Sequence, residues 1–208
     1  MKANKDEQIG LLVILKAQKG KEDQVKKFLK EGLDLVNQEP NTESWFAFQI
    51  DERTFGIFDT FKNEAGRQEH LSGSVAKALL ANASSLLEGF EIKTTIQPVG
   101  VLRSHKISGN ENKGLLVIVE AKQGKSKEVE DFLKVGEQLV KAEPQTVSWY
   151  AIKLADGKYA IFDTFADEAG REAHLHGKIA AALMENAAIL LDEFNHTAIQ
   201  KINIIASK

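Results

Sequence analysis

Hydrophobic and polar positions near the start of the chain predict a short strand followed by a helix. Leu11–Leu15 is continuously apolar, which is typical of a strand covered on both faces. Residues 21–37 place apolar side chains such as Val25 and Leu29 at helical spacing, so they predict an amphipathic helix. Pro40 follows at the position where such a helix would stop.

A hairpin, a second helix and a last strand follow. Residues 44–50 and 54–61 are rich in aromatic and β-branched side chains and flank a short polar turn, which predicts a β-hairpin. Asn63 is a good N-cap for a second helix, in which Gly73 is a candidate kink. A last strand is expected around residues 92–102. The order βαββαβ is that of the ferredoxin-like fold, an antiparallel four-stranded sheet with two helices on one face.

The whole pattern is repeated once, at a constant offset of 104 residues. Gly10–Ile14 returns as Gly114–Ile118, and Ile57–Phe61 returns as Ile161–Phe165. The match runs without a gap to Phe90 and then needs a one-residue deletion in the second copy. The sequence therefore divides into a polar N-terminal tail (1–9), a first repeat (10–103), a polar, turn-rich linker (104–113) and a second repeat (114–208).

The predicted strands carry apolar side chains on both faces of the sheet, although the two helices of a repeat cover only one. Trp45 and Phe46, like Ile57 and Phe58, are neighbours on a strand and therefore point to opposite faces. A unit of this size buries only about 60% of its unfolded surface, so a second cover is energetically favourable. We predict an α+β protein in which the two βαββαβ repeats pack sheet to sheet as an intrachain dimeric α/β barrel. A further homodimer of this pseudo-dimer is left open.

Composition and charge narrow the class of partner. A formal net charge of −3 without a dense Lys/Arg stripe argues against nucleic acid, because phosphate binding needs clustered cations. The absence of cysteine excludes disulfides and thiolate chemistry. Residues 1–8 lack the apolar core of a signal peptide, and no apolar run approaches the ~20 residues of a membrane span. We expect a cytoplasmic protein with no membrane partner.

Motifs of both repeats resemble the antibiotic biosynthesis monooxygenase (ABM) family. The resemblance rests on the order of the elements, the Trp of the second strand, the Phe-Asp-Thr-Phe strand end, and Asp/Asn-Glu-Ala-Gly-Arg-x-x-His-Leu-x-Gly, which starts at Asn63 and Asp167. It implies the dimeric α+β barrel fold and, among its members, oxygenases of quinols and polyketide-like aromatics that need no cofactor. The Asn/Trp/His arrangement of haem-degrading members cannot be mapped onto this sequence, so we expect no cofactor and no metal.

The sharpest candidates for catalysis are His70 and His174. A neutral imidazole near pH 7 can take a proton from a phenol or quinol, the first step toward a carbanion that meets O₂. The resemblance implies that a His at this place points toward the cavity. The alternative is a His that bonds a backbone carbonyl or lies in solvent. Arg67 and Arg171 lie one turn earlier and can share a face with the His, where they would stabilise an oxyanion.

Two further pairs are candidates for substrate binding. Trp45 and Trp149 can stack against a flat aromatic ligand, although a strand Trp is more often part of the core. Asp59 and Asp163 close the third strand just before the second helix. The alternative that we favour for the Asp is an ion pair between Asp59 and Arg67 that fixes the corner between strand and helix.

Thr60 and Thr164 complete the candidate set. Each can hydrogen-bond a ligand, although a strand Thr more often satisfies nearby backbone groups. His174 and His176 are a weak metal signal, because residues two apart on a helix do not face one way.

Two functions are compatible with these residues. The first is a cofactor-independent monooxygenase that acts on a small aromatic or quinol-type substrate in the barrel cavity. The second is a non-catalytic small-molecule-binding or stress-response module of the same fold, because fold does not dictate function. Either function requires a pocket of about several hundred Å³ near Trp45 and His70, whereas a filled interior would favour a purely structural unit.

Overall fold

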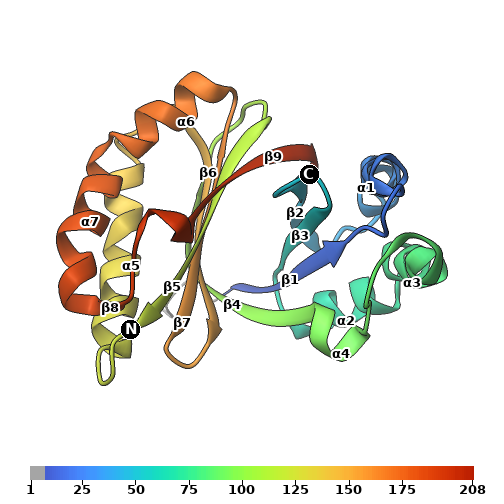
Figure 1. Cartoon of the computed structure of the whole chain (residues 1–208), viewed down its shortest axis with the longest axis horizontal. Helices are drawn as coiled ribbons and strands as arrows, with labels where there is room; N and C mark the ends of the chain where they lie inside the picture. The colour runs from blue at the N-terminus through green and yellow to red at the C-terminus, as the bar shows by residue number, and fades with distance from the viewer. Residues whose placement is uncertain (1–7) are drawn as a thin grey trace. The chain divides into compact units, whose positions relative to one another are not determined.

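The chain forms two compact units in the computed structural model, which describes residues 8–208 apart from the side chains of Gln8 and His196. Unit 1 comprises residues 100–201, and unit 2 comprises residues 8–99 together with residues 202–208. In each unit, helices lie on one face of an antiparallel sheet, as Figure 1 shows for α5 and α7 of unit 1 and for α1 and α3 of unit 2. The α+β class is confirmed.

Unit 2 carries the first βαββαβ pattern. Its elements are β1 (Gln8–Lys16), α1 (Glu22–Val36), β2 (Thr42–Gln49), β3 (Thr54–Phe61), α2 (Glu64–Ser72), α3 (Ser74–Leu86) and α4 (Ile92–Thr95). The central strand β3 pairs antiparallel with both β1 and β2, so Asp59 stands opposite Leu11 on one side and Trp45 on the other. The predicted hairpin is therefore confirmed in its strands and in its pairing.

Unit 1 repeats this arrangement. Its elements are β5 (Lys113–Ala121), α5 (Ser126–Val140), β6 (Thr146–Ala155), β7 (Lys158–Phe165), α6 (Glu168–Leu175), α7 (Lys178–Leu190), β8 (Leu191–Asp192) and a 3₁₀ turn (His196–Ala198). Two strands are divided between the units: β4 (Ile96–Lys106) enters unit 1 at residue 100, and β9 (Ile199–Ser207) leaves it after residue 201. Its central strand β7 pairs antiparallel with β5 and β6, and Asp163 stands opposite Trp149. The predicted linker is shorter than expected, because β4 runs to Lys106 and β5 begins at Lys113. Of the predicted tail 1–9, residues 1–7 lie outside the described residues.

The last strand of each repeat pairs with one strand of its own repeat and with one strand of the other repeat. Residues 100–106 of β4 pair antiparallel with β6, in register from Gly100 opposite Lys153 to Lys106 opposite Ser148. Residues 203–207 of β9 likewise pair antiparallel with β2. The sequence predicted a last strand in the sheet of its own repeat, and β4 and β9 do neighbour β1 and β5 there, but each strand also continues into the sheet of the other repeat. The exchange explains why unit 2 includes residues 202–208.

The first helix forms because its apolar residues recur on one side. Val25, Leu29, Gly32 and Val36 are the buried positions of α1, three or four residues apart, and they face the sheet core. Gly32 faces the ring of Trp45, and a Cβ at this position would lie at an ordinary van der Waals distance of 3.5 Å from it. In the second copy, the matching distance from Gly136 to Trp149 is 3.1 Å.

The predicted second helix is in fact two helices, separated by Gly73. Asn63 caps α2, because its side chain accepts a hydrogen bond of 3.0 Å from the backbone N–H of Gly66. Gly73 is extended rather than left-handed, with φ −79° and ψ −174°, so its role is not conformational. A Cβ on Gly73 would lie 2.8 Å from a carboxylate oxygen of Glu39. The glycine therefore leaves space for that carboxylate.

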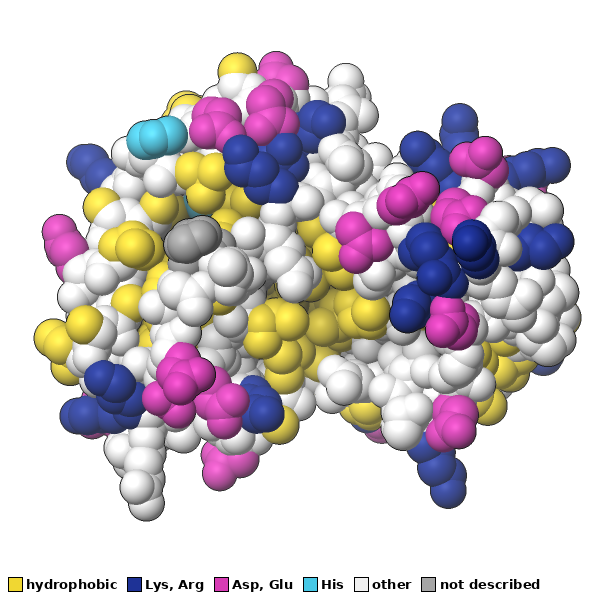
Figure 2. All heavy atoms as spheres, viewed as in Figure 1, with side chains coloured by type: hydrophobic (Ala, Val, Ile, Leu, Met, Phe, Trp, Pro, Cys, Tyr) yellow, Lys and Arg dark blue, Asp and Glu magenta, His cyan; other side chains and the backbone are white. Residues whose placement is uncertain are grey.

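The surface shows no concentration of one charge on the face drawn in Figure 2, where Lys and Arg are interspersed with Asp and Glu. Among the described residues, none of the helices combines the length and the apolar character that a membrane crossing requires.

Candidate active site

A buried histidine lies between two carboxylates in the first repeat. His70 Nδ1 lies 2.7 Å from Glu39 Oε2, and His70 Nε2 lies 3.2 Å from Asp59 Oδ2. His70 is 6% exposed and Asp59 is 1% exposed. The ring of Phe61 packs against the imidazole, with the ring centroids 5.2 Å apart. We call Glu39, Asp59 and His70 the first site; its histidine is not the solvent-exposed residue of the alternative interpretation.

The second repeat contains the same arrangement. His174 Nδ1 lies 2.8 Å from Glu143 Oε2, and His174 Nε2 lies 3.4 Å from Asp163 Oδ2. The hydroxyl of Thr146 lies 3.0 Å from Nδ1 and accepts a hydrogen bond from the protonated ring. We call Glu143, Asp163 and His174 the second site. Its independent recurrence shows that the Glu–His–Asp geometry is a property of the repeat.

Each member of a site comes from a different element. Glu39 and Glu143 follow the first helix of their repeat, Asp59 and Asp163 lie on its central strand, and the His ends its second helix. The strand turns the Asp side chain to the helix-covered face, because Trp45 and Asp59 stand in register and share a face. The tertiary fold, and not local sequence, therefore brings the three groups together.

Burial and mutual charge set the protonation of these groups. Burial raises the pKa of Asp59 to about 7, although the charge of His70 opposes the shift. Burial also raises the pKa of Asp163, against the opposing effect of His174. Burial disfavours the charged ring of His174, but Asp163 and Glu143 outweigh it and raise its pKa to about 10. The ring of His174 is therefore a cation at neutral pH, with an N–H directed to each side.

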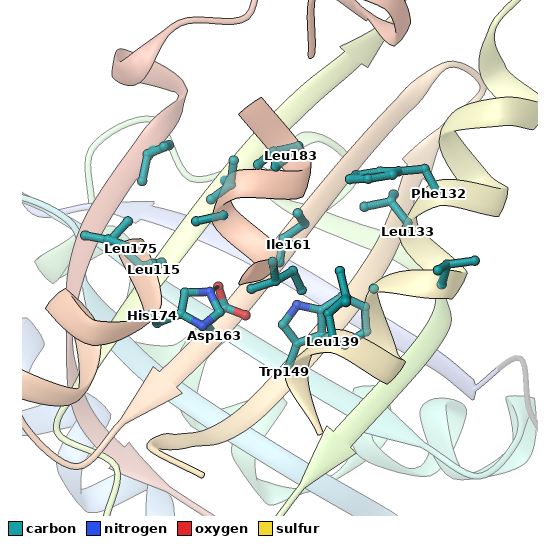
Figure 3. Close-up of a pocket in the computed structure, with 16 residues that line it drawn as sticks. Leu115, Phe132, Leu133, Leu139, Trp149, Ile161, Asp163, His174, Leu175 and Leu183 are labelled. Atoms are coloured by element: carbon teal, nitrogen blue, oxygen red, sulfur yellow. Dashed lines mark ion pairs between the residues drawn. The ribbon is translucent and has the colours of Figure 1, made fainter. Parts of the chain in front are cut away.

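An apolar pocket adjoins the second site, between the sheet and helices α5 and α7 (Figure 3). It encloses a cavity of about 60 Å³ and includes Trp149, Asp163 and His174 in its wall. In Figure 3 the indole nitrogen of Trp149 is turned toward Asp163 and His174. Most of the remaining wall is aliphatic, with side chains such as Leu115, Leu133, Leu139, Ile161, Ile179 and Leu183.

The first repeat has a pocket at the corresponding place, next to Trp45. It encloses about 240 Å³ between α1, α3 and the sheet, but neither Asp59 nor His70 lines it. His70 and Glu39 line a separate, more polar cavity of about 280 Å³. The sequence required a pocket near Trp45 and His70 together. The second repeat, rather than the first, brings the matching residues to one cavity, although this cavity of about 60 Å³ is smaller than the several hundred Å³ that the sequence led us to expect.

Several buried polar atoms at these pockets lack a hydrogen-bond partner among the described residues. They include the indole N–H of both Trp45 and Trp149, and the Oδ1 atom of Asp163. An unpaired buried donor or acceptor costs about 1–3 kcal/mol. In the second pocket, one such acceptor and one such donor lie on the same cavity wall, which is where a ligand hydroxyl would pair with both.

The structure separates the predicted site residues into two groups. It brings His174, Asp163 and Trp149 together at one pocket. The Arg residues are directed elsewhere: Arg67 pairs with Glu64 at 2.5 Å, and Arg171 pairs with Glu168. The favoured ion pair between Asp59 and Arg67 was therefore wrong, because the partner of the Asp is the histidine one helical turn further along.

The two threonines do not line these pockets either. Thr60 and Thr164 each follow the site Asp on the strand, so they point to the opposite face of the sheet. Thr164 donates a hydrogen bond of 3.0 Å to Glu111. Their prediction as ligand contacts at the same site as Trp45 and Trp149 is not compatible with this alternation.

Sequence reasoning missed Glu39 and Glu143. A signal was present, because Glu39-Pro40 returns as Glu143-Pro144 at the repeat offset, and Thr42 returns as Thr146. Pro40 had been interpreted only as the end of a helix. The carboxylate directly before this proline is recognisable as a site residue only when the histidine that it contacts is known.

Known structures share this fold over the whole chain. No protein-family model matches the chain, and no curated protein matches it. A "putative monooxygenase" from Fusobacterium nucleatum has a TM-score of 0.82 at 15% identity, covering 98% of this chain and 95% of that one. An anthrone oxidase-like protein has a TM-score of 0.63 at 12% identity, covering 98% of this chain and 94% of that one.

A third structure connects the fold to the family named above. It is a ferredoxin-fold protein from Listeria monocytogenes related to antibiotic biosynthesis monooxygenases, with a TM-score of 0.54 at 9% identity, covering 95% of each chain. The chain is thus an α+β protein with the ferredoxin-like fold of the ABM-related proteins. The resemblance inferred from the sequence motifs is confirmed at the level of the fold.

Proposed function

We propose that the protein is a cofactor-independent monooxygenase acting on a small aromatic or quinol-type substrate. The observation that carries the proposal is the unpaired acceptor Asp163 Oδ1 beside the unpaired indole N–H of Trp149, in the wall of an apolar pocket. A phenolic hydroxyl both donates and accepts, so it can satisfy both atoms, and its ring fits aliphatic walls. The anthrone oxidase-like neighbour supports an aromatic substrate.

The proton acceptor in this proposal is the aspartate. Both nitrogens of His174 face carboxylates, at 2.8 and 3.4 Å, so the ring offers no lone pair to a substrate. Asp163 lines the pocket, has one oxygen without a hydrogen-bond partner, and has a raised pKa, which makes it a stronger base than an ordinary carboxylate. His174 acts as a fixed cation that stabilises the anion formed when the substrate hydroxyl ionises.

The remaining chemistry belongs to the substrate and to O₂. Ionisation of the hydroxyl makes the ring electron-rich, and electrons pass from the ring to O₂. One oxygen atom becomes a carbonyl on the oxidised ring carbon, and the other leaves as water with the hydrogen that this carbon loses and the proton that the hydroxyl gave up. The dry walls of the pocket would protect the reactive intermediate from water. Arg67, Arg171, Thr60 and Thr164 have no part in this step.

We also propose that the two repeats form the intrachain dimeric α/β barrel that the sequence predicts. Strands β2 and β3 carry stacked aromatic side chains on the face away from the helices, with the ring centroids of Phe46 and Phe58 6.2 Å apart. Large apolar side chains on that face favour cover by a second sheet. The strands β4 and β9, shared between repeats, support an arrangement in which each repeat needs the other. As the sequence predicts, we place this protein in the cytoplasm.

The direct test is oxygen consumption with a panel of quinols, naphthols and anthrones. We expect uptake by the wild-type chain with at least one of them, and a loss of about 100-fold or more in kcat for Asp163→Asn. The double variant His70→Ala/His174→Ala should lose activity to a similar extent. The matched control is His176→Ala, because this exposed histidine is two residues from His174 and outside the pocket. No uptake with any substrate would contradict the enzyme.

A non-catalytic small-molecule-binding module, including one in a stress response, is the alternative. It is favoured by the first pocket, whose wall includes Trp45 but neither Asp59 nor His70. Ligands that raise the melting temperature without being converted, together with unchanged oxygen levels, would establish this function instead.

A further inference from the structure

We infer that the two repeats take different ligands: the first pocket binds a larger aromatic with a positively charged substituent, and the second binds a smaller, uncharged one. The inference rests on the proposed function only in that both pockets bind aromatic ligands. The walls are otherwise alike, since Phe28, Leu35 and Trp45 return as Phe132, Leu139 and Trp149. The two pockets therefore differ at only a few lining positions within otherwise matching walls.

The first difference is size. The cavity encloses about 240 Å³ in the first repeat and about 60 Å³ in the second. Val75 lines the first, and Ile179 replaces it at the repeat offset in the second. The extra methyl of Ile179, Cδ1, lies 3.5 Å from where a Cβ on Gly136 would stand, a position that is itself 3.1 Å from the Trp149 ring. The added methyl thus fills the space beside the indole.

The second difference is charge at the wall of the pocket. Glu31 lines the first pocket, whereas Val135, 61% exposed, takes its place in the second. The Glu31 carboxylate is 64% exposed and lies 3.7 Å from Lys27, so water and the lysine weaken its field. We therefore expect Glu31 to give the first pocket only a modest preference for cationic over anionic substituents. Pocket size should contribute more to the difference in ligand selectivity between the two pockets.

The third difference is access to the buried charges. Asp163 and His174 line the second pocket, but Asp59 and His70 do not line the first. A ligand in the second pocket touches the Asp–His pair, and a ligand in the first does not. The two pockets therefore have different functions. A small phenol reacts in the second pocket, and the first pocket binds a larger ligand that is not converted.

The chain contains only two tryptophans, one in each pocket, so they report on the two sites separately. Labelling with 5-fluorotryptophan gives two ¹⁹F resonances in the wild-type chain, which Trp45→Phe assigns. Three probes separate the properties: 1-naphthol, which is small and neutral, 9-(aminomethyl)anthracene, which is large and cationic, and 9-anthracenecarboxylate, which is large and anionic.

We expect 1-naphthol to shift the Trp149 resonance, and both anthracenes to shift only the Trp45 resonance. The cation should bind about threefold more tightly than the anion, and Glu31→Val should remove this difference. Val75→Ile should weaken anthracene binding at least fivefold, and Ile179→Val should allow an anthracene to shift the Trp149 resonance. Asp163→Asn should abolish turnover, while Asp59→Asn should change it less than threefold.

Equal responses of both resonances to every probe would overturn the inference, as would the absence of any response. Oxygen uptake tests the enzyme proposal independently of ligand binding. Site-selective binding without oxygen uptake would leave the division between pockets standing and remove the monooxygenase. Oxygen uptake that falls equally in Asp59→Asn and Asp163→Asn would keep the enzyme and remove the division.

Discussion

At the residue scale, the defining feature is a buried histidine held between two carboxylates, of which the Asp is fully buried in both repeats. Burying charge is costly, and a buried ionic group is stable only when its partners are well placed. In both repeats the two imidazole nitrogens each meet one carboxylate oxygen within 3.4 Å. In the second site, the two carboxylates hold the His174 ring as a cation, and Asp163 Oδ1 has no hydrogen-bond partner among the described residues.

The charge of His174 makes stability depend on pH. Its folded pKa, about 10, lies above the ordinary value of 6.5, so the folded state binds the proton more tightly than the unfolded chain. The stabilisation is therefore fully present below pH 6.5 and is lost as the pH rises through 10. We expect the difference in unfolding free energy between the wild type and His174→Gln to shrink across this range. Urea denaturation at several pH values measures it, and a difference that grows with pH would contradict the assignment.

Removal of the outer carboxylate tests its effect on the ring. We expect Glu143→Gln to lower the pKa of His174 and to destabilise the fold by about 3 kcal/mol, because a buried charge loses one of its partners. Titration of the His174 ring by NMR measures the first effect, and denaturation measures the second. The matched control is Glu120→Gln, which breaks an exposed pair with Lys158 and should cost less than about 1 kcal/mol.

At the element scale, the break between two helices makes room for that carboxylate. Gly177 separates α6 from α7 as Gly73 separates α2 from α3, and neither glycine is left-handed. A Cβ on Gly177 would lie 2.3 Å from Glu143 Oε1, closer than any real contact. The same carboxylate oxygen accepts a hydrogen bond from the N–H of Ile179, in the first turn of α7. The helix break and the site are therefore one structural feature.

A methyl group added at Gly177 should disturb both the break between α6 and α7 and the position of Glu143. We expect Gly177→Ala to destabilise the chain by about 1–3 kcal/mol, because the Glu143 side chain must move, and Gly73→Ala to cost less, because its contact is longer. Gly100→Ala is the control, since the nearest atom to its Cβ would be 3.9 Å away. Denaturant unfolding of the three variants measures the order. Equal costs at positions 100 and 177 would show that the carboxylate does not need the space.

At the scale of the whole molecule, the repeats are connected both by the linker and by strand pairing, because each repeat contributes its last strand to the sheet of the other. Strand β4 continues the chain from unit 2 into unit 1, and residues 202–208 return to complete unit 2. In unit 2, β2 would be an edge strand without β9, with a row of unpaired backbone groups. An exchanged strand protects that edge.

Deletion of residues 202–208 tests this protection. The strand β2 loses the partners that pair with Phe46–Gln49, so we expect lower stability and self-association through the exposed edge. Size-exclusion chromatography with light scattering measures the mass, and ¹⁹F resonances of the labelled tryptophans show whether the Trp45 environment is the one disturbed. A deletion variant that remains monomeric with unchanged stability would contradict the structural role of β9.

Most of the elements could be predicted from the sequence, because each is encoded locally. The period of apolar residues specified α1, the aromatic and β-branched runs specified the hairpin of β2 and β3, and Asn63 specified the start of α2. The site was predicted in part. His174, Trp149 and Asp163 were named, but the Asp was assigned to the wrong partner and Glu143 was not named at all.

The sequence by itself determined the duplication, the βαββαβ order and the residue types on each face of each strand, because periodicity and repeat offset are properties of the chain alone. Tertiary structure decided which charged groups meet, because Glu143, Asp163 and His174 are brought together from three elements far apart in the sequence. It also decided where β4 and β9 pair, since an apolar strand fits any sheet edge with matching register and only the folded chain selects one.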